Sequence, residues 1–322
     1  MNISPEEIAE MKSKSDEMMI QHGKIHINFD KVFGKGASST VFKGHLIGPS
    51  PLHEQQQTVQ TQQFVDCDVA VKVTNNFGQT EVEQLFKEID AMKKMGYHEN
   101  VMCMLGWALP GDTPCLVFEI AEKDLLHYVP EFRDAGAKVM PYQKFLDILR
   151  QIIQDKFLFI FLYDSEILRM QYIASKGLVH RDLAARNVLL FANSIAKISD
   201  FGLCCSIDES LTERSTLSLK LPIKWLSLEA LIDRIFSEKS DVWSFGVLMY
   251  EVFTFGGIPY ATMNNDKLVM FLKSGARLEL PNNMDVGLYE IMLSCWRENL
   301  KERPTFVELE EKFHGYIDEA LC

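Results

Sequence analysis

Two short stretches constrain this chain more than any other part of it. One runs from His180 to Asn187, and the other is Asp200-Phe201-Gly202. Together they supply two carboxylates, Asp182 and Asp200, and the carboxamide of Asn187. One carboxylate can orient an attacking hydroxyl group, while the other two side chains offer the hard oxygen atoms that Mg²⁺ prefers. This ordered set is typical of phosphoryl-transfer chemistry.

Composition narrows the class of protein. The chain has 322 residues and 47% hydrophobic content, which predicts a packed core in one large or two medium domains. Its net charge of −12 would repel a phosphate backbone, so we expect no nucleic-acid partner. Any nucleotide must therefore be held by a local site.

Cysteine usage and hydropathy bear on the cellular compartment. Seven cysteines without C-x-x-C spacing indicate neither a disulfide framework nor a zinc site, so we expect a reducing compartment. The N-terminus lacks the pattern of a secretory signal. The longest aromatic and aliphatic run, Phe157 to Tyr163, is too short to span a bilayer, so we expect no transmembrane segment in this chain.

The first third of the chain reads as a lead-in followed by strands. Residues 1–22 are polar and predict a flexible or loosely packed segment. The alternation from Ile25 to Phe29 predicts a strand, and residues 33–44 predict a strand, a tight glycine turn and a second strand. Two close glycines let a backbone approach phosphate oxygens, although this pair taken alone favours an ordinary hairpin turn.

The next segment combines a polar stretch with a strand and a helix. Residues 45–68, rich in proline and glutamine, predict a long solvent loop. Residues 68–73 predict a strand whose single lysine, Lys72, lies either on a solvated face or at a phosphate. A helix is expected from Thr80, as N-cap, to Met95.

Gly96 would end that helix, and one face of it combines charged and apolar residues. A glutamate on this face could point inward toward Lys72, and helical spacing alone leaves three candidates: Glu81, Glu83 and Glu88.

Taken together, these motifs resemble those of protein tyrosine kinases, most closely the receptor-type enzymes, over about residues 25–316. The resemblance implies an α+β, two-lobed kinase fold with a small antiparallel β-sheet lobe carrying one helix and a larger, mainly α-helical lobe. We expect a kinase domain over residues 23–318, with lobes of about 23–121 and 122–318.

The resemblance assigns the catalytic residues. Asp182 would accept or orient the proton of the substrate hydroxyl group, and Asn187 and Asp200 would bind Mg²⁺. Lys72 would hold the α- and β-phosphates of ATP, and Glu88 would hold Lys72. Each of these side chains alone is more often a surface, turn or capping residue, but the ordered set favours catalysis.

The resemblance also implies an ATP site. Adenine would bind the Glu119 carbonyl and the Ala121 N–H, and Phe118 would close the pocket behind it, so a bulky back-pocket inhibitor should fit poorly. The remaining nucleotide contacts would come from the glycine turn and the facing strands: Gly34, Lys35, Gly36, Val41, Ala70 and Lys72.

Two features indicate tyrosine as the acceptor. Serine/threonine kinases usually carry a lysine two residues after the catalytic aspartate, where this chain has Ala184, and the positive group is instead Arg186. Residues 221–229 resemble the platform beneath the phenol ring in tyrosine kinases. By the same resemblance, Asp241 would hold the backbone of the catalytic loop, and Arg303 would pair with Glu229.

Three departures from the family pattern stand out. Ser39 replaces the third glycine of the turn. Residues 155–169 interrupt the helix expected over 142–179, and they represent either an apolar docking element or an unspliced intron or gene-model error. No tyrosine lies between Asp200 and Glu229, so we expect Glu213, beside Thr212, to supply part of the charge that Arg181 would receive from a phosphotyrosine. Cys204 and Cys205 are expected to be unreactive.

The sequence therefore predicts an ATP- and Mg²⁺-dependent protein tyrosine kinase acting on protein substrates in receptor-type signalling. The alternatives are a kinase-like scaffold with little turnover and a serine/threonine kinase. We expect a cytoplasmic location, with the cytoplasmic face of the plasma membrane as a second option through association with a membrane receptor or a dimer.

Overall fold

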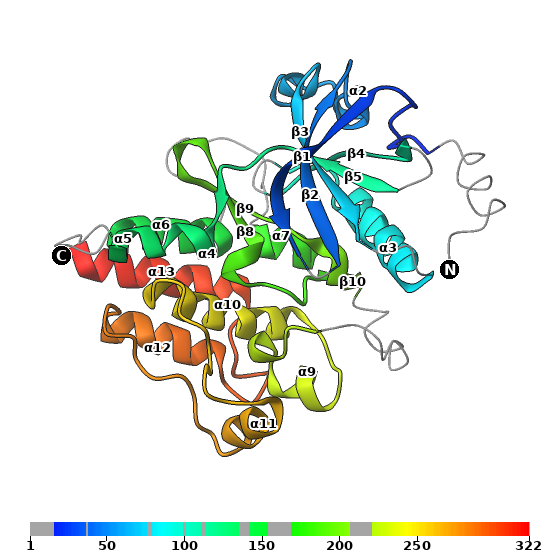
Figure 1. The fold of residues 1–322 in the computed structure, drawn as a ribbon. Helices are drawn as coiled ribbons and strands as arrows, with labels where there is room; N and C mark the ends of the chain where they lie inside the picture. The colour runs from blue at the N-terminus through cyan, green and yellow to red at the C-terminus, as the bar shows by residue number, and fades with distance from the viewer. Residues whose placement is uncertain are drawn as a thin grey trace. The chain divides into compact units, whose positions relative to one another are not determined.

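The computed structural model describes residues 16–36, 38–75, 79–98, 101–110, 114–134, 142–153, 169–206 and 221–321. The chain divides into two units between Ile120 and Ala121, next to the predicted lobe boundary. The smaller unit holds an antiparallel sheet and the larger unit is mainly helical (Figure 1). The predicted α+β kinase fold class is confirmed.

The small unit is built on a five-stranded antiparallel sheet with the order β1-β2-β3-β5-β4. Its central strands are rich in β-branched and aliphatic residues, which suit a pleated, buried surface. Strands were expected over the regions of β1, β2 and β3, and β1 is longer than predicted. Their bounds are β1 Ile25–Lys35, β2 Ser39–Leu46, β3 Asp68–Thr74, β4 Met104–Ala108 and β5 Cys115–Phe118.

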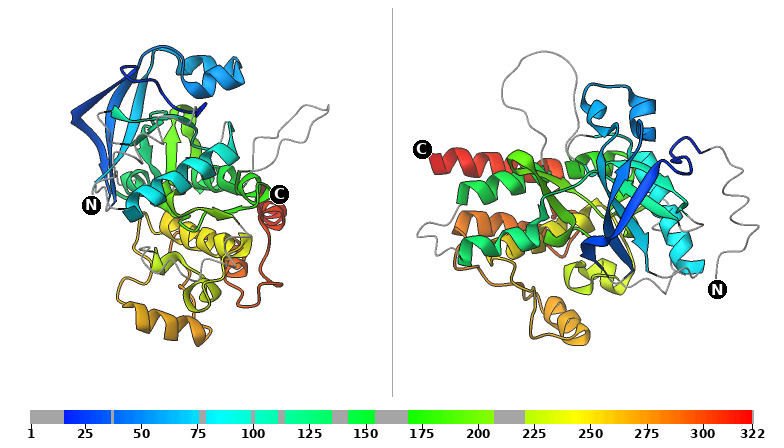
Figure 2. Two further views of the ribbon diagram at one scale, coloured as in Figure 1. Left: turned by 90° about the vertical axis from the view of Figure 1, so that its right-hand side faces the viewer. Right: turned by 45° about the horizontal axis from the view of Figure 1, so that its top comes forward.

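Helix α3, Gln79–Met95, lies against β4 (Figures 1 and 2). Leu85, Glu88 and Met92 are buried on one face, as helical spacing predicted. The helix ends at Gly96, which has a φ of +69° that a residue with a side chain rarely adopts. The helix begins at Gln79, so the prediction that Thr80 caps it is wrong.

Residues 45–68 do not form the predicted long loop. They contain helix α2, Pro51–Gln56, and a 3-10 helix η1, Gln60–Phe64. The Ser50 hydroxyl caps α2 by accepting the His53 N–H at 3.1 Å. Leu52 and Phe64 are buried beneath a polar outer face, so this part of the chain has a small core of its own. We call it the α2–η1 segment.

Residues 16–20 are packed, contrary to the prediction of a loose lead-in over 1–22, and residues 1–15 lie outside the described part of the chain. Ile20 donates its N–H to the Trp107 carbonyl at 2.8 Å, and Trp107 donates to the Met18 carbonyl at 3.0 Å. Met18 and Ile20 are buried. This segment extends the sheet along the β4 edge, and we call residues 16–20 the N-terminal strap.

The large unit is organised around α10, Glu238–Phe253, whose side chains are buried along most of its length. Ser240 Oγ accepts the Ser237 N–H at 3.0 Å at the start of this helix. Helices α6, α12 and α13 pack around it or around one another (Figure 2). The other helices are α4 Leu125–Tyr128, α5 Pro130–Asp134, α6 Tyr142–Ile153, α7 Arg169–Ser175, α9 Leu228–Ile232, α11 Asn265–Lys273, α12 Val286–Cys295 and α13 Phe306–Leu321.

Short strands and 3-10 turns complete the large unit. Strands β6, β8 and β9 form one antiparallel sheet, and β7 pairs with β10. The helix predicted over 142–179 is present in part, as α6 and α7, whereas Leu178 and Val179 form strand β7. Residues 154–168, which hold nearly all of the predicted insertion, lie outside the described residues. The bounds are β6 Lys123–Asp124, β7 Leu178–Val179, β8 Val188–Phe191, β9 Ile195–Ile198, β10 Cys205–Ser206, η3 Ala185–Asn187, η4 Ala192–Ser194, η5 Phe201–Leu203 and η6 Ile223–Trp225.

A buried ion pair joins distant parts of the large unit. Arg303 Nη1 donates to Glu229 Oε1 at 2.7 Å, and Nη2 donates to Oε2 at 3.2 Å. The Arg303 side chain is fully enclosed and lies over the Trp243 ring at 5.1 Å. The predicted Arg303–Glu229 contact is confirmed.

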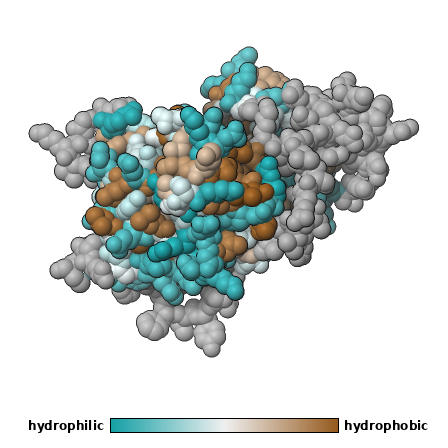
Figure 3. All heavy atoms as spheres, turned by 90° about the horizontal axis from the view of Figure 1, so that it is seen from below, coloured by the Kyte–Doolittle hydropathy of each residue, from teal (hydrophilic) through white to brown (hydrophobic). Residues whose placement is uncertain are grey.

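The surface of the large unit is mixed in polarity. On the face seen in Figure 3, separate apolar areas alternate with polar ones. Among the helices that the structure describes, none has the length and apolar character needed to cross a membrane.

Candidate active site

The loop from His180 to Asn187 connects β7 to β8 in the large unit and is held from below by α10. The Asp241 carboxylate accepts the backbone N–H groups of His180 at 2.8 Å and of Arg181 at 3.0 Å. Arg181 has a φ of +65°, so these two bonds secure a turn that a residue with a side chain rarely adopts. The predicted contact between Asp241 and this loop is confirmed.

His180 is a buried part of the loop framework. Its Nδ1 accepts the Asp182 N–H at 3.2 Å, so Nε2 carries the proton and donates to the Ser199 carbonyl at 3.1 Å. Complete burial lowers the pKa of His180 to about 4. The ring is therefore neutral near pH 7 and links the loop to the strand that precedes Asp200.

Asp182 lies at the centre of the loop and is only 9% exposed. Burial raises the pKa of its carboxyl group to about 6, although the charge of Arg186 acts in the opposite direction. Arg186 Nη2 donates to Asp182 Oδ1. A carboxylate with a pKa just below neutrality suits a general base at physiological pH.

Asn187 and Asp200 are brought together by the β8–β9 hairpin. Val188 pairs with Ile198, and the Ser199 N–H donates to the Asn187 carbonyl at 2.8 Å. Asn187 Nδ2 donates to the Asp182 carbonyl at 2.7 Å, which leaves its amide oxygen as the remaining donor atom for a metal. Asp200 is exposed at a left-handed φ of +63°.

These oxygen atoms fit Mg²⁺, which takes one or two side-chain ligands together with phosphate oxygens. No cluster of three or more histidine, cysteine, aspartate or glutamate residues placed for a metal occurs in the ranges that the structure describes.

Sequence reasoning missed Glu251, a residue of α10 that contacts this loop. Its Oε2 accepts the Ala185 N–H at 2.9 Å and the Trp225 indole N–H at 3.0 Å. The Arg186 guanidinium lies 4.4 Å from the centre of the Trp225 ring. An acidic residue within the apolar C-terminal half of α10 was the signal that could have found it.

The small unit holds the other predicted catalytic pair. Lys72 Nζ on β3 donates to Glu88 Oε1 at 2.7 Å and to Oε2 at 2.9 Å. Glu88 is 4% exposed on α3. The contact selects Glu88 from the three glutamates that helical spacing left open.

The glycine turn lies between β1 and β2. Gly34 pairs with Val41, and the Gly36 N–H donates to the Ser39 carbonyl at 2.8 Å. Asn75, which sequence reasoning missed, donates through Nδ2 to the Gly36 carbonyl at 3.1 Å. No atom lies within 4 Å of the position that a Cβ at Gly34 would take, so the backbone here is open to close approach.

The model of the protein tyrosine and serine/threonine kinase family matches residues 27–313. The chain belongs to this kinase family. The kinase is similar to fibroblast growth factor receptor 1 of Pleurodeles waltl, with 36% identity over 87% of this chain and 33% of that relative. It is similar to the fibroblast growth factor receptor of Strongylocentrotus purpuratus, with 36% identity over 89% of this chain and 28% of that relative.

The kinase spans about a third of the length of the curated relatives it matches, between 28% and 37%. The predicted resemblance to receptor-type tyrosine kinases is confirmed at the level of the domain.

The strands that carry the other predicted nucleotide-binding residues are present in the structure. Val41 pairs with Lys72 across β2 and β3, and Lys43 pairs with Ala70. Ala70 and Phe118 are buried, and the Glu119 side chain accepts the Cys103 N–H at 3.5 Å. The adenine contacts of Glu119 and Ala121 remain predictions. So do the nucleotide contacts of the glycine turn, which includes Lys35.

The activation segment of the kinase is described only at its ends. Thr212 and Glu213 lie outside the described residues, so the proposed contact between Glu213 and Arg181 remains a prediction. Arg181 Nε donates to the Leu203 carbonyl, and its guanidinium lies 5.1 Å from the centre of the Phe236 ring. Cys204 and Cys205 are buried, which fits the expectation that they are unreactive.

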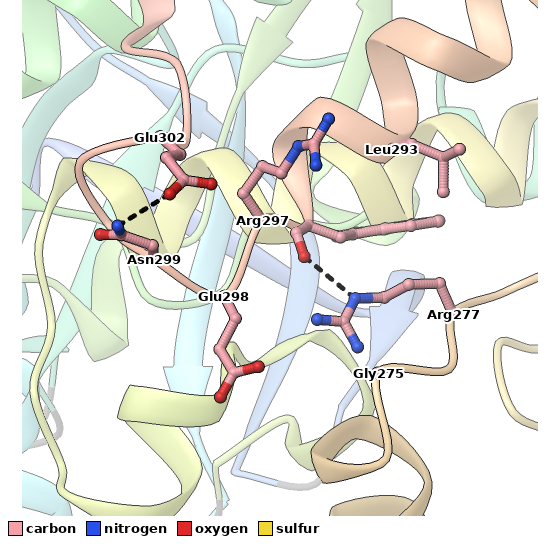
Figure 4. Close-up of a pocket in the computed structure, with 8 residues that line it drawn as sticks. Gly275, Arg277, Leu293, Arg297, Glu298, Asn299 and Glu302 are labelled. Carbon is pink, nitrogen blue, oxygen red and sulfur yellow. Dashed lines mark hydrogen bonds between the residues drawn. The ribbon is translucent and has the colours of Figure 1, made fainter.

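A cavity of about 660 Å³ lies elsewhere in the large unit (Figure 4). Arg277 and Trp296 form part of its wall, and Arg277 Nε donates to the Trp296 carbonyl at 2.9 Å. None of the predicted site residues lines this cavity, so it is separate from the catalytic loop.

Proposed function

We propose that this kinase domain transfers the γ-phosphate of ATP to tyrosine hydroxyl groups of protein substrates. The observation that carries the proposal is the ion pair between Asp182 and Arg186 inside a buried, backbone-anchored loop. Ala184 occupies the position where serine/threonine kinases usually carry a lysine. The positive charge beside the base therefore comes from Arg186, as in tyrosine-directed kinases.

Asp182 acts on the acceptor hydroxyl. Its carboxylate accepts the phenolic proton as the oxygen attacks the γ-phosphorus atom. The bond from that phosphorus to the β–γ bridging oxygen breaks, and ADP leaves with the electron pair. A positioned base of this kind contributes about 10² to 10⁴ in rate.

The nucleotide is held by groups from the small unit. Lys72, held by Glu88, binds the α- and β-phosphates, and the glycine turn covers them through backbone N–H groups. Asn187 and Asp200 would hold Mg²⁺ through the buried amide and the exposed carboxylate, and the ion would supply positive charge to the phosphate oxygens.

A receptor-type setting extends the same proposal. Relatives named as fibroblast growth factor receptors are about three times the length of the aligned domain, which supports a role as the catalytic part of a signalling protein. We place this domain in the cytoplasm, where ATP and reduced cysteines are available. In this proposal the domain associates with a membrane receptor or with a second copy of itself.

The test is a Mg-ATP assay with a tyrosine-containing peptide, using Asp182→Asn as the control. We expect phosphate transfer that the variant loses by at least about 10²-fold. Transfer that does not depend on Asp182, or no transfer at all, would favour a kinase-like scaffold.

Phosphoamino-acid analysis of a mixed peptide substrate then identifies the acceptor. We expect phosphotyrosine. Phosphoserine or phosphothreonine as the main product would instead identify a serine/threonine kinase.

A further inference from the structure

A buried carboxylate lies in the last turn of α10, where helix geometry disfavours negative charge. Glu251 is 2% exposed, and burial raises the pKa of its carboxyl group. The C-terminal end of a helix carries partial negative charge, and an isolated buried carboxylate is costly. Specific partners must therefore compensate for Glu251.

Those partners are the two N–H donors described above, and both bond to the same oxygen, Oε2. The Ala185 N–H is 2.9 Å away and the Trp225 indole N–H is 3.0 Å away. Ala185 belongs to the catalytic loop, and Trp225 belongs to η6, which follows the activation segment. One oxygen of Glu251 therefore ties two separate segments together.

Both tied segments meet at Arg186. Ala185 precedes Arg186 in the chain, so its bond to Glu251 fixes the backbone from which the arginine starts. The Trp225 ring lies 4.4 Å beneath the guanidinium and supports the charged end. That charged end pairs with Asp182 Oδ1.

We propose that Glu251 is a positioning residue for phosphoryl transfer, which sets Arg186 through Ala185 and Trp225 and thereby orients the Asp182 carboxylate. This inference rests on the proposed function. Glu251 reaches the reacting groups only through these intermediates. Its loss should lower the rate of transfer and leave nucleotide binding by the small unit unchanged.

The experiment uses the complete chain with four variants: Glu251→Ala, Glu251→Gln, Trp225→Phe and Val252→Ala. Glu251→Gln keeps an acceptor oxygen. Trp225→Phe keeps an aromatic ring at this position but removes the indole N–H donor. Val252 is equally buried on the same helix and has no hydrogen bond to the loop through its side chain, so Val252→Ala controls for lost packing. Each variant is assayed with Mg-ATP and a tyrosine peptide at one pH, so that kcat and the KM for Mg-ATP are compared directly.

We expect Glu251→Ala to lower kcat by roughly 10- to 100-fold, because small misplacements of catalytic groups have effects of this size. The KM for Mg-ATP should stay within about twofold. Glu251→Gln should recover part of the rate, and Trp225→Phe should lie between the two.

Val252→Ala should keep a kcat close to that of the wild type, whatever its effect on stability. A Glu251→Ala enzyme with the wild-type kcat would overturn the proposal. An equal loss of kcat in Val252→Ala, or a Glu251→Gln enzyme no faster than Glu251→Ala, would also overturn it.

A second measurement separates this inference from the proposed function, whose failure would appear as wild-type protein with no Asp182-dependent transfer. In that case hydrogen exchange of the Trp225 indole N–H, assigned by its absence in Trp225→Phe, tests the contact directly. We expect slow exchange in the wild type and in Val252→Ala, and faster exchange in Glu251→Ala. Equal rates in all three proteins would refute the role of Glu251.

Discussion

The ring nitrogen Nδ1 of His180 accepts the backbone N–H of Asp182, with 3.2 Å between the two nitrogen atoms. This bond requires an imidazole without a proton on Nδ1. Protonation of His180 would therefore break the contact that shapes the loop at the catalytic carboxylate.

The first prediction follows from the pKa of His180, which burial lowers to about 4. Between pH 4 and the unfolded pKa of about 6.5, the unfolded chain binds this proton and the folded chain does not. The stabilisation that neutral, buried His180 gives the folded state is therefore fully present above pH 6.5 and is lost as the pH falls. We expect His180→Asn to be less stable than the wild type at pH 7, and the gap to narrow by about 2 kcal/mol at pH 5.

Urea denaturation of both proteins at the two pH values measures that gap. Asp182 and Asp241 also titrate in this range, but they are common to both proteins and cancel to first order in the difference. A gap that is constant with pH would contradict the neutral, buried state of His180.

The second prediction concerns the pH dependence of the reaction. Asp182 must be ionised to accept a proton, and its pKa is raised to about 6, so kcat should fall as the pH drops below about 6. Arg186 lowers this pKa, so Arg186→Gln should move the acidic limb to higher pH. Arg150→Gln, on helix α6, is the control and should leave the limb unchanged.

The third prediction concerns the Lys72–Glu88 pair. Hydrogen bonds to charged groups contribute about 1.5–3 kcal/mol, so Glu88→Gln should lower kcat/KM for Mg-ATP by roughly 10- to 100-fold. Asp90→Asn, an exposed carboxylate two residues further along the same helix, should have no comparable effect. Steady-state kinetics of the two variants side by side would show whether the loss is specific to Glu88.

The fourth prediction concerns the N-terminal strap. Asp16 accepts the Trp107 indole N–H at 3.0 Å and pairs with Lys93 of α3. Asp16→Ala should reduce the free energy of unfolding by about 1–3 kcal/mol, because the indole donor loses its partner in a partly buried site. Glu17→Ala, at an exposed neighbouring position, should change stability by less than about 0.5 kcal/mol. Similar losses in both variants would mean that the strap contributes nothing specific.

The fifth prediction concerns Phe118, which is buried at the end of β5. If it closes the space behind the adenine, Phe118→Ala should increase the affinity for an ATP-competitive inhibitor with a bulky back-pocket group. Titration calorimetry with a matched inhibitor lacking that group provides the comparison. Tight binding of the bulky compound to the wild type would exclude this role for Phe118.

The sequence predicted the parts of the site that depend on local order. Asp182, Asn187 and Asp200 lie within one loop and one hairpin, so their spacing already places them together. Lys72 and Glu88 required only a strand and a helix of known period.

The missed residues depend on contacts between distant positions. Glu251 meets Ala185, 66 residues earlier, and no periodicity within α10 indicates that encounter. The composition of the α2–η1 segment predicts a loop, because its many exposed glutamines conceal two buried apolar residues, Leu52 and Phe64. Tertiary packing overrode the local composition there.

Gly106 of strand β4 connects two of the elements that the sequence did not predict. A Cβ at this position would lie 2.8 Å from Ile20 Cγ1, 2.9 Å from the Met18 carbonyl and 3.0 Å from Pro51 Cγ. The absence of one methyl group therefore lets the N-terminal strap and the α2–η1 segment both pack against the same strand. Any lineage that acquired alanine here would have to remodel two separate surface elements at once, so Gly106 limits how the outside of this lobe can diverge.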